Sequence, residues 1–328
     1  MTAFLKDILN NLSLGPGVTH ANLTVFPVHH EGGVALPYLS LDKALELGVV
    51  EITEVGGGGE VPNVSVANRG DTPVLILAGE ELVGAKQNRL VNATFLLAGN
   101  TRLILPVSCV EQGRWSPRTA RFQSQKRLSS YLLRSRVHQD VSDSLKAGRG
   151  FRADQMEVWD EIRDKAARLG VASPTGAMAD IFESYEDQLR HYTQSFPLSP
   201  HQKGLLAVLN GRPAGLEVFD SHPSLARYFD KLIQSYALDA LDLHLQGPSS
   251  SKPRFSPEAW LEEVQELPVT ASPSLSLGED LRVKSRRCLG AGLRYQGVVL
   301  YLSIFAQNRP GKSGLARASR RGSLRRII

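Results

Sequence analysis

Two short motifs hold most of the side chains in this sequence that could do chemistry. The first is Gly79-Glu80-Glu81-Leu82-Val83-Gly84-Ala85-Lys86-Gln87-Asn88-Arg89, and the second is Val107-Ser108-Cys109-Val110-Glu111-Gln112-Gly113-Arg114-Trp115. Each comes directly after an apolar run, residues 73–78 and 103–107, which is typical of a buried strand. Because polar groups are costly to bury without partners, the motifs predict either an internal polar network or a site that binds a polar ligand.

The first motif combines carboxylates with a run of polar and basic side chains. We expect Gly84 and Ala85 to bend the chain, so that the residues after them line the mouth of a pocket. The candidate acid/base groups are Glu80 and Glu81. The candidate ligand-binding residues are Lys86, Gln87, Asn88 and Arg89. The alternative is a solvated edge strand, in which pairs between Glu and Lys or Arg only stabilise the fold.

The second motif offers a carboxylate, a thiol, and an arginine beside an aromatic ring. Glu111 is a candidate acid or base, because a carboxyl group at a strand end beside apolar surface can have a raised pKa. Cys109 is a candidate nucleophile if a nearby cation lowers the pKa of its thiol, and a buried, inert thiol is the alternative. Gln112, Arg114 and Trp115 are candidate ligand-binding residues, with the guanidinium gripping phosphate oxygens and the indole covering an aromatic portion.

Residues 112–139 form the strongest concentration of positive charge before the C-terminal tail, with no acidic residue among them. The basic residues are Arg114, Arg118, Arg121, Lys126, Arg127, Arg134 and Arg136. Neither the local balance of charge nor pairing along a helix provides partners for these cations, which favours a role in binding a phosphate-bearing ligand. The alternative is a solvated helix face.

The overall composition is that of an ordinary globular protein, with 42% hydrophobic and 22% charged residues in a chain of 328. The net charge is +5, and residues 309–328 carry seven basic residues and no acidic one. Subtracting these seven charges from +5 leaves −2 for residues 1–308. The basic character therefore belongs to the tail, where it favours weak contact with nucleic acid.

The sequence predicts neither a metal nor a cofactor. Its two cysteines, Cys109 and Cys288, show no spacing typical of a disulfide framework or a zinc site, and the histidines form no ligand pattern with carboxylates. Near the N-terminus, Lys6 and Asp7 interrupt the apolar residues, unlike in a signal peptide, and no apolar run is long enough to span a membrane. We therefore expect a cytoplasmic protein without membrane contact.

Strand signals dominate the first third of the chain, and helical periodicity follows. Strands are expected at residues 23–28, 49–55, 61–66, 74–78 and 102–109, with one short helix at residues 40–47. Helices are then expected within residues 128–145, 156–169 and 178–192.

The C-terminal part has clearer turn and capping signals. Asn210-Gly211 predicts a type I′ hairpin turn between strands 204–209 and 212–219. Helices are expected to begin after Ser221 and Ser256. A final β pair, residues 281–295 and 298–305, is expected to turn at Gln296-Gly297.

This order of elements predicts an α+β fold, in which a β-rich N-terminal part and C-terminal strands form a sheet packed by a central helical segment. We expect a single α+β domain over residues 1–308 and a basic, disordered tail over residues 309–328. Two domains, divided near residue 120 or 200, are the alternative.

Over the two motifs the sequence resembles the family named ARG and Rhodanese-Phosphatase-superfamily-associated protein domain, where ARG denotes ADP-ribosylglycohydrolase. The resemblance rests on Gly79-Glu80-Glu81 with Gly84-Ala85-Lys86-Gln87-Asn88-Arg89, and on Pro106-Val107-Ser108-Cys109-Val110-Glu111-Gln112-Gly113-Arg114-Trp115. It runs over most of residues 15–306. The family implies association with ADP-ribose and phosphate chemistry but no particular reaction.

We therefore expect a domain that binds a phosphorylated nucleotide-type metabolite, such as an ADP-ribose or NAD derivative, beside ADP-ribose-processing enzymes. Whether it also processes this ligand stays open, because the sequence contains no nucleophile–base pair. The alternative is a non-catalytic scaffold or partner-binding module, with weak nucleic-acid binding through the tail. Clustering of Glu81, Arg89, Glu111 and Arg114 around an open cleft favours the first function, and mutual pairing in a closed interior favours the second.

Overall fold

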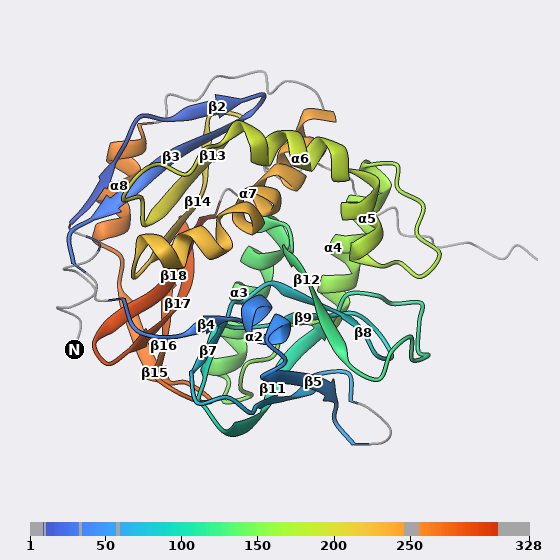
Figure 1. Cartoon of the computed structure of the whole chain (residues 1–328). Coiled ribbons are helices and arrows are strands. Elements are labelled where there is room, and N and C mark those ends of the chain that lie inside the picture. The colour runs from blue at the N-terminus through green and yellow to red at the C-terminus, as the bar shows by residue number, and fades with distance from the viewer. Residues whose placement is uncertain (1–8, 10, 33–34, 57–59, 246–255, 308–328) are drawn as a thin grey trace, which may run out of the picture.

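Figure 1 shows the computed structural model of this chain, which describes residues 9, 11–32, 35–56, 60–245 and 256–307. The described residues combine three β-sheets with helices, which confirms the α+β class. The basic tail, residues 309–328, lies outside the described residues, so its expected disorder stays a prediction.

The largest sheet brings strands from both ends of the chain together. Its order is β1 (Leu12–Leu14), β3 (Leu23–His30), β13 (Gly204–Leu209), β14 (Arg212–Phe219), β18 (Val298–Ala306), β17 (Cys288–Tyr295), β16 (Glu279–Lys284) and β15 (Val269–Pro273), and β2 (Val18–His20) pairs with β3. Both faces of this sheet are buried, because successive residues such as Leu205 and Leu206 belong to different core clusters. The C-terminal strands therefore complete a sheet that the N-terminal strands begin, as expected.

The other N-terminal strands form two smaller sheets, a division that the sequence did not predict. The six-stranded sheet has the order β12 (Phe122–Leu128), β8 (Glu80–Gly84), β9 (Arg89–Val91), β11 (Thr101–Cys109), β6 (Asn63–Asn68) and β5 (Val50–Glu54). The three-stranded sheet has the order β10 (Phe95–Leu97), β7 (Val74–Ile76) and β4 (Leu39–Ser40). Strand β12 was not predicted from the sequence. Most of its residues are polar, so apolar and polar positions do not alternate along it.

Helices cover the sheets. They are α2 (Leu41–Glu46), α3 (Tyr131–Lys146), α4 (Gln155–Arg168), α5 (Met178–Ser184), α6 (Glu186–Ser195), α7 (His222–Leu245) and α8 (Pro257–Gln265). The long helix α7 crosses one face of the largest sheet and packs on β13 and β14, while α8 contributes to the core cluster on the other face (Figure 1). Helix α4 packs on β11 of the six-stranded sheet, whereas α6 packs on α7, with α5 preceding it in the chain (Figure 1).

Several local predictions are confirmed. The hydroxyl groups of Ser40 and Ser256 accept hydrogen bonds from backbone N–H groups at the start of α2 and α8, so both serines are N-caps. Asn210 and Gly211 have φ values of 48° and 71°, which are those of a type I′ turn, and they join β13 to β14.

Two predicted elements are wrong in their extent. The helix expected within residues 178–192 divides at Tyr185 into α5 and α6. The strand expected at residues 281–295 is two antiparallel strands, β16 and β17, with a turn between them. Both errors arise because a continuous hydrophobic pattern does not reveal a short break in the backbone.

A buried ion pair joins α3 to the largest sheet. Nη2 of Arg134 donates to Oε1 of Glu217 at 2.9 Å, and the hydroxyl groups of Tyr236 and Tyr301 donate to the same carboxylate at 2.7 and 2.6 Å. The side chains of Arg134 and Glu217 are fully buried. The Arg134 stem also lies against Gly79, at the start of the first motif, where an added Cβ atom would be 2.5 Å from Cδ.

We predict that Gly79→Ala lowers the melting temperature more than Gly148→Ala. Both glycines have positive φ, 90° and 69°, so each substitution strains the backbone by roughly 1–2 kcal/mol. Only at Gly79 does the new Cβ atom overlap Arg134, which adds roughly 1–3 kcal/mol, whereas nothing lies within 4 Å at Gly148. Thermal unfolding measures both variants, and equal losses would show that Arg134 moves aside without cost.

Candidate functional site

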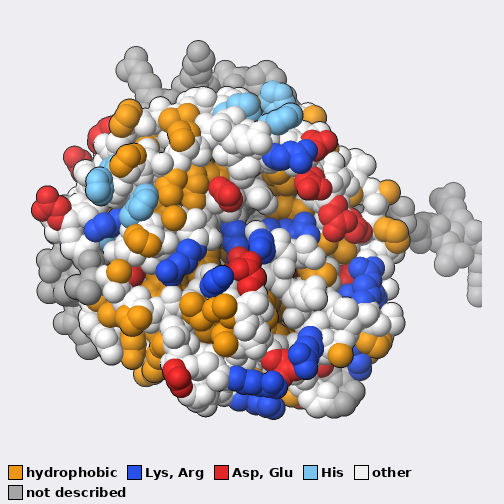
Figure 2. All heavy atoms as spheres, viewed as in Figure 1, with side chains coloured by type: hydrophobic (Ala, Val, Ile, Leu, Met, Phe, Trp, Pro, Cys, Tyr) orange, Lys and Arg blue, Asp and Glu red, His pale blue; other side chains and the backbone are white. Residues whose placement is uncertain are grey.

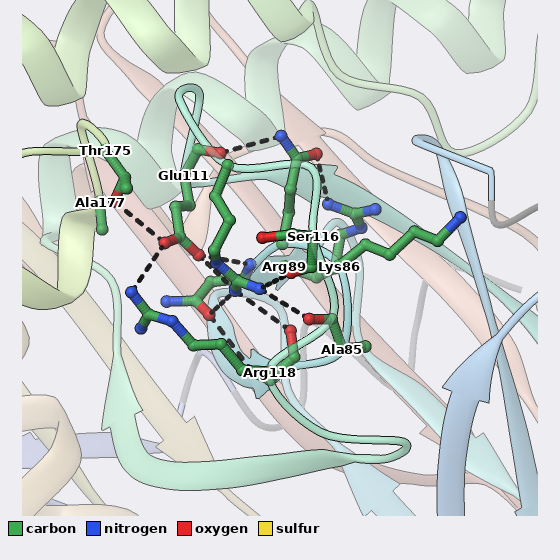
Figure 3. Close-up of polar contacts among 12 residues, drawn as sticks. Ala85, Lys86, Arg89, Glu111, Ser116, Arg118, Thr175 and Ala177 are labelled. Atoms are coloured by element: carbon green, nitrogen blue, oxygen red, sulfur yellow. Dashed lines mark hydrogen bonds and ion pairs between the residues drawn. The ribbon is translucent and has the colours of Figure 1, made fainter.

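The two motifs converge in space. Gly84 and Ala85 have φ values of 121° and 41°, so the chain bends between β8 and β9 as expected. Strand β9 then pairs with the end of β11, with Arg89 opposite Cys109. The loop at residues 85–88 therefore lies beside residues 110–115, and Figure 3 shows the polar contacts that join the two segments.

The carboxylate of Glu111 is the centre of these contacts. It accepts hydrogen bonds from Nη2 of Arg114 at 2.6 Å, from the backbone N–H of Asn88 at 3.2 Å and from the hydroxyl of Thr175 at 3.0 Å. Burial by itself would raise the pKa of Glu111, but these donors outweigh it and hold the pKa below its ordinary value. A carboxylate stabilised in its charged form suits a structural network better than general acid catalysis.

Arg114 completes this network. Its Nη1 donates to the carbonyl oxygens of Ala85 at 2.6 Å and Ser116 at 2.7 Å, and its Nη2 also donates to Oδ1 of Asn88 at 3.2 Å. These acceptors belong to the protein itself, so the guanidinium holds the two motifs together. We call Glu111, Arg114 and Asn88 with these contacts the motif brace.

Gln87 links the motif brace to the proposed nucleophile. Its Nε2 donates to the backbone oxygen of Glu111 at 3.0 Å, and its Oε1 accepts from Nη1 of Arg89 at 3.0 Å and from Sγ of Cys109 at 3.1 Å. Burial raises the pKa of the Cys109 thiol, which keeps it protonated at neutral pH. This environment favours the alternative of a buried, inert thiol.

Trp115 is the aromatic residue of the second motif, and much of its side chain is exposed. Its indole is 49% exposed, and its ring centre lies 5.3 Å from Nζ of Lys86 and 5.9 Å from Cζ of Arg89. Arg89 itself is fully buried, 3.7 Å from a carboxylate oxygen of Glu54, and its Nε and Nη2 atoms have no hydrogen-bond partner. In Figure 3 the Lys86 side chain extends away from the carboxylate of Glu111.

Glu80 takes part in a separate ion-pair cluster. Its carboxylate accepts hydrogen bonds from Nζ of Lys231 at 2.6 Å and from the backbone N–H of Leu77 at 2.9 Å. Lys231 also pairs with Asp42 at 2.7 Å. The cluster connects β8 with α7 and α2, so the contacts of Glu80 are those of a structural group rather than an acid/base group.

Glu81 differs from Glu80 and Glu111 because its carboxylate has no hydrogen bond in the described structure. Its Oε2 lies 3.0 Å from Nε of Arg127, but neither atom is aligned for a hydrogen bond with the other. The side chain is fully buried. Burial raises its pKa to about 7, and Arg127 opposes this rise. Among the motif carboxylates, Glu81 is therefore the best suited to take up or release a proton near neutral pH.

Arg127 also lines a cavity of about 400 Å³ between β12, α5, α6 and α7. Figure 2 shows basic and acidic side chains around the hollow near the middle of this face. The charged residues in the cavity wall are Lys126, Arg127, Arg190, Glu183 and Glu186, and the wall also includes Gln125, Phe182 and Gln234. The sequence does not reveal this cavity because its wall comes from four separate segments, of which only β12 lies in the basic stretch.

The backbone of β12 is irregular beside this cavity. A bulge interrupts its pairing with β8 between Ser124 and Leu128, and Lys126 has a φ of 54°, which is unusual for a residue with a side chain. Bulges redirect side chains and are common next to functional sites. Here the bulge precedes Arg127, whose guanidinium lies 5.2 Å from the ring centre of Phe182 in the cavity wall.

The remaining predicted ligand residue, Gln112, lies apart from this cavity. It lines a second cavity of about 330 Å³, together with Trp159, Ile162 and Ala166 of α4. In the part of the chain that the structure describes, no group of three His, Cys, Asp or Glu side chains could hold a metal ion. Within the same residues, no helix is both long enough and apolar enough to cross a membrane.

The basic residues of the stretch 112–139 are not unpaired, so that expectation is wrong. Each lies within ion-pair distance of a carboxylate that comes from outside the stretch. The pairs are Arg114–Glu111, Arg118–Glu111, Arg121–Glu51, Lys126–Glu46, Arg127–Glu81, Arg134–Glu217 and Arg136–Glu157. Charge in this stretch therefore does not by itself indicate a ligand.

Comparison with known protein families gives one match that covers most of the chain. A family model described as ARG and Rhodanese-Phosphatase-superfamily-associated Protein domain matches residues 11–305. Comparison with curated proteins and with solved structures found no match. The matched residues include both motifs, the cavity wall and the strands of all three sheets.

We predict that Glu111→Gln destabilises the fold strongly, because it leaves the buried guanidinium of Arg114 without its charged partner. Removing one member of a buried ion pair costs roughly 3–5 kcal/mol. Glu46→Gln is the matched control, since Glu46 pairs with Lys126 on the exposed surface and the substitution should have little effect. Denaturant unfolding measures both, and similar midpoints would contradict a central role for the motif brace.

We also predict that the stability of Glu81→Gln relative to the wild type rises between about pH 5 and 7 and is level above that range. The raised pKa means that the folded state holds a proton on Glu81 that the unfolded state releases, so wild-type stability falls as pH rises toward about 7. Each pH unit in that window changes the difference by up to about 1.4 kcal/mol. Melting temperatures of both proteins across this range test the prediction, and parallel pH profiles would refute it.

Proposed function

This chain belongs to the ARG and Rhodanese-Phosphatase-superfamily-associated Protein domain family, and on that premise we propose that it binds a phosphorylated, nucleotide-type metabolite such as an ADP-ribose or NAD derivative. The family description, which records association with ARG, supports the class of ligand. It also supports a role beside enzymes that process ADP-ribose. A cytoplasmic location fits the two buried free thiols, Cys109 and Cys288, because the cytoplasm is reducing.

The cavity between β12, α5, α6 and α7 is the binding site in this proposal. Its volume of about 400 Å³ lies within the usual range for small-molecule sites, roughly 300–1,000 Å³. Lys126, Arg127 and Arg190 offer contacts to phosphate oxygens in a wall of mixed charge that also contains Glu183 and Glu186. Phe182 supplies an aromatic surface. The amide groups of Gln125 and Gln234 add donors and acceptors for hydroxyl groups of a sugar.

The single observation that carries this proposal is the incomplete pairing of Arg127. Its side chain is 9% exposed, its Nε has no hydrogen-bond partner, and Glu183 is 3.8 Å from its Nη2. A guanidinium in this position can form aligned hydrogen bonds with an oxyanion without first breaking any of its own. By contrast, Arg114 already donates to several internal acceptors, so its part in the proposal is to hold the motif brace.

Trp115, Lys86 and Arg89 have a secondary place in the proposal. The exposed indole with two neighbouring cations offers a stacking surface for an aromatic base. Arg89 is fully buried, so its guanidinium is not accessible to a ligand in this structure. The surface around Trp115 is therefore a weaker candidate for the binding site than the cavity.

A non-catalytic scaffold is the second candidate function, and the motif brace is the observation that favours it. The contacts of Glu111, Arg114 and Asn88 are mutual and buried, as expected if the motifs only make the fold rigid. The two functions differ in one measurable respect, since a scaffold has no reason to bind a phosphorylated metabolite in the cavity.

We predict that ADP-ribose raises the melting temperature of the full chain, whereas adenosine, which lacks phosphate, does not. A ligand that binds only the folded state stabilises it in proportion to the logarithm of its concentration over its dissociation constant. Arg127→Lys keeps the charge but loses the planar fork, so it should weaken binding several-fold, by on the order of a kcal/mol.

Arg163→Lys is the matched control for this experiment. Arg163 lines the second cavity and is exposed, so its substitution should leave the affinity for ADP-ribose unchanged. Titration calorimetry measures the affinities of the wild type and both variants. Equal affinities for wild type and Arg127→Lys would place the site elsewhere, and no effect of any phosphorylated nucleotide would favour the scaffold.

A further inference from the structure

A carboxyl group that does not line the cavity contacts one of its cations. Glu81 lies behind Arg127, fully buried, and both of its carboxylate oxygens lack a hydrogen-bond partner. The charged groups that face it are Arg127 from β12, Glu183 and Asp180 from α5, and Glu111 from the end of β11. Arg127 is the sole cation in this group, so the charged form of Glu81 depends on it.

An anion in the cavity would compete with Glu81 for the same guanidinium. The contact between Arg127 and Glu81 is a close ion pair without an aligned hydrogen bond, whereas a phosphate oxygen can align with the guanidinium N–H groups. Once the anion neutralises Arg127, Glu81 loses its attractive neighbour and gains a further negative charge nearby. Glu183 and Asp180 already repel a charge on Glu81, so protonation is the remaining way to remove it.

We propose that anion binding at Arg127 is coupled to the uptake of one proton by Glu81. This inference rests on the proposed binding function and adds a mechanism to it. The proton comes from solvent and binds one carboxylate oxygen, giving a neutral carboxyl group behind the bound ligand. The site therefore selects ligands whose oxyanion keeps its full charge near neutral pH, such as a pyrophosphate diester or a sulfate-like group.

The direction in which affinity changes with pH follows from the protonation state of Glu81 in the protein without ligand. Burial raises the pKa of Glu81 to about 7, so the group is largely protonated at lower pH and largely ionised at higher pH. Proton uptake on binding is therefore small below this pH and approaches one proton above it. Affinity for the anion should be constant at low pH and should fall toward tenfold per pH unit above about pH 7.

ADP-ribose is the first probe, because its pyrophosphate is esterified at both ends and has no group that titrates in this range. A phosphate monoester would confuse the measurement, since its second pKa is about 6. Titration calorimetry at about pH 8, repeated in buffers of different ionisation enthalpy, gives the number of protons taken up. For the wild type we expect close to one proton, and for Glu81→Gln we expect binding with close to none.

Glu161→Gln is the matched control variant. Burial also raises the pKa of Glu161, which pairs with Lys165 on α4, but Glu161 does not line the cavity. Its substitution should leave the proton uptake at the wild-type value. Loss of uptake in this variant, or its persistence in Glu81→Gln, would overturn the assignment to Glu81.

Two further measurements separate the inference from the binding function on which it rests. Sulfate serves as a second probe: if ADP-ribose does not bind but sulfate binds with proton uptake, the proposed ligand class is wrong and the coupling stands. If ADP-ribose binds without proton uptake, the binding function stands and the coupling is wrong. Infrared difference spectra of the wild type, which report the C=O band of a protonated carboxyl group, decide the matter if Glu81→Gln does not fold.

Discussion

The burial of charged side chains is the constraint on which the rest of this structure depends. An unpaired charge in a protein interior costs several kcal/mol, so each buried cation needs a carboxylate brought to it by the fold. The chain meets this need with pairs that join elements far apart in sequence, Arg134–Glu217, Lys231–Glu80, Lys165–Asp239 and Arg114–Glu111 among them. These pairs hold helices α3, α7 and α4 and the two motifs in fixed positions, so the charge network and the tertiary structure specify each other.

The pair between Arg127 and Glu81 is less complete than the four pairs named above. The other buried pairs above have aligned hydrogen bonds, whereas both oxygens of Glu81 and Nε of Arg127 have none. This pair also borders the cavity and follows a bulge with a strained backbone at Lys126. Proteins keep such local imperfections mainly where function requires them, and the motif brace supplies the rigid support that a preorganised site needs.

Much of the fold was predictable because local signals and tertiary structure agree. The caps at Ser40 and Ser256 and the turn at Asn210-Gly211 depend on neighbouring residues alone, and all three were predicted. Strand β12 and the break at Tyr185 were missed, because neither changes the hydrophobic period of its surroundings. The division of the N-terminal strands into separate sheets also left no mark in the sequence, since strand order depends on pairing between distant segments.

The sequence by itself determined that the two motifs are chemically rich, that Gly84 and Ala85 bend the chain, and that the motifs follow strand ends. Only the tertiary structure decided what each polar group does. Residues 112–139 have no acidic residue, yet their cations find partners such as Glu51, Glu81 and Glu217. Local charge patterns cannot reveal such partners, because Coulomb interactions act through space and the fold sets the distances. Glu80 and Glu81 also differ because of the fold. Adjacent residues on one strand face opposite sides, so Glu80 pairs with Lys231, whereas Glu81 lies beside Arg127 of the cavity wall.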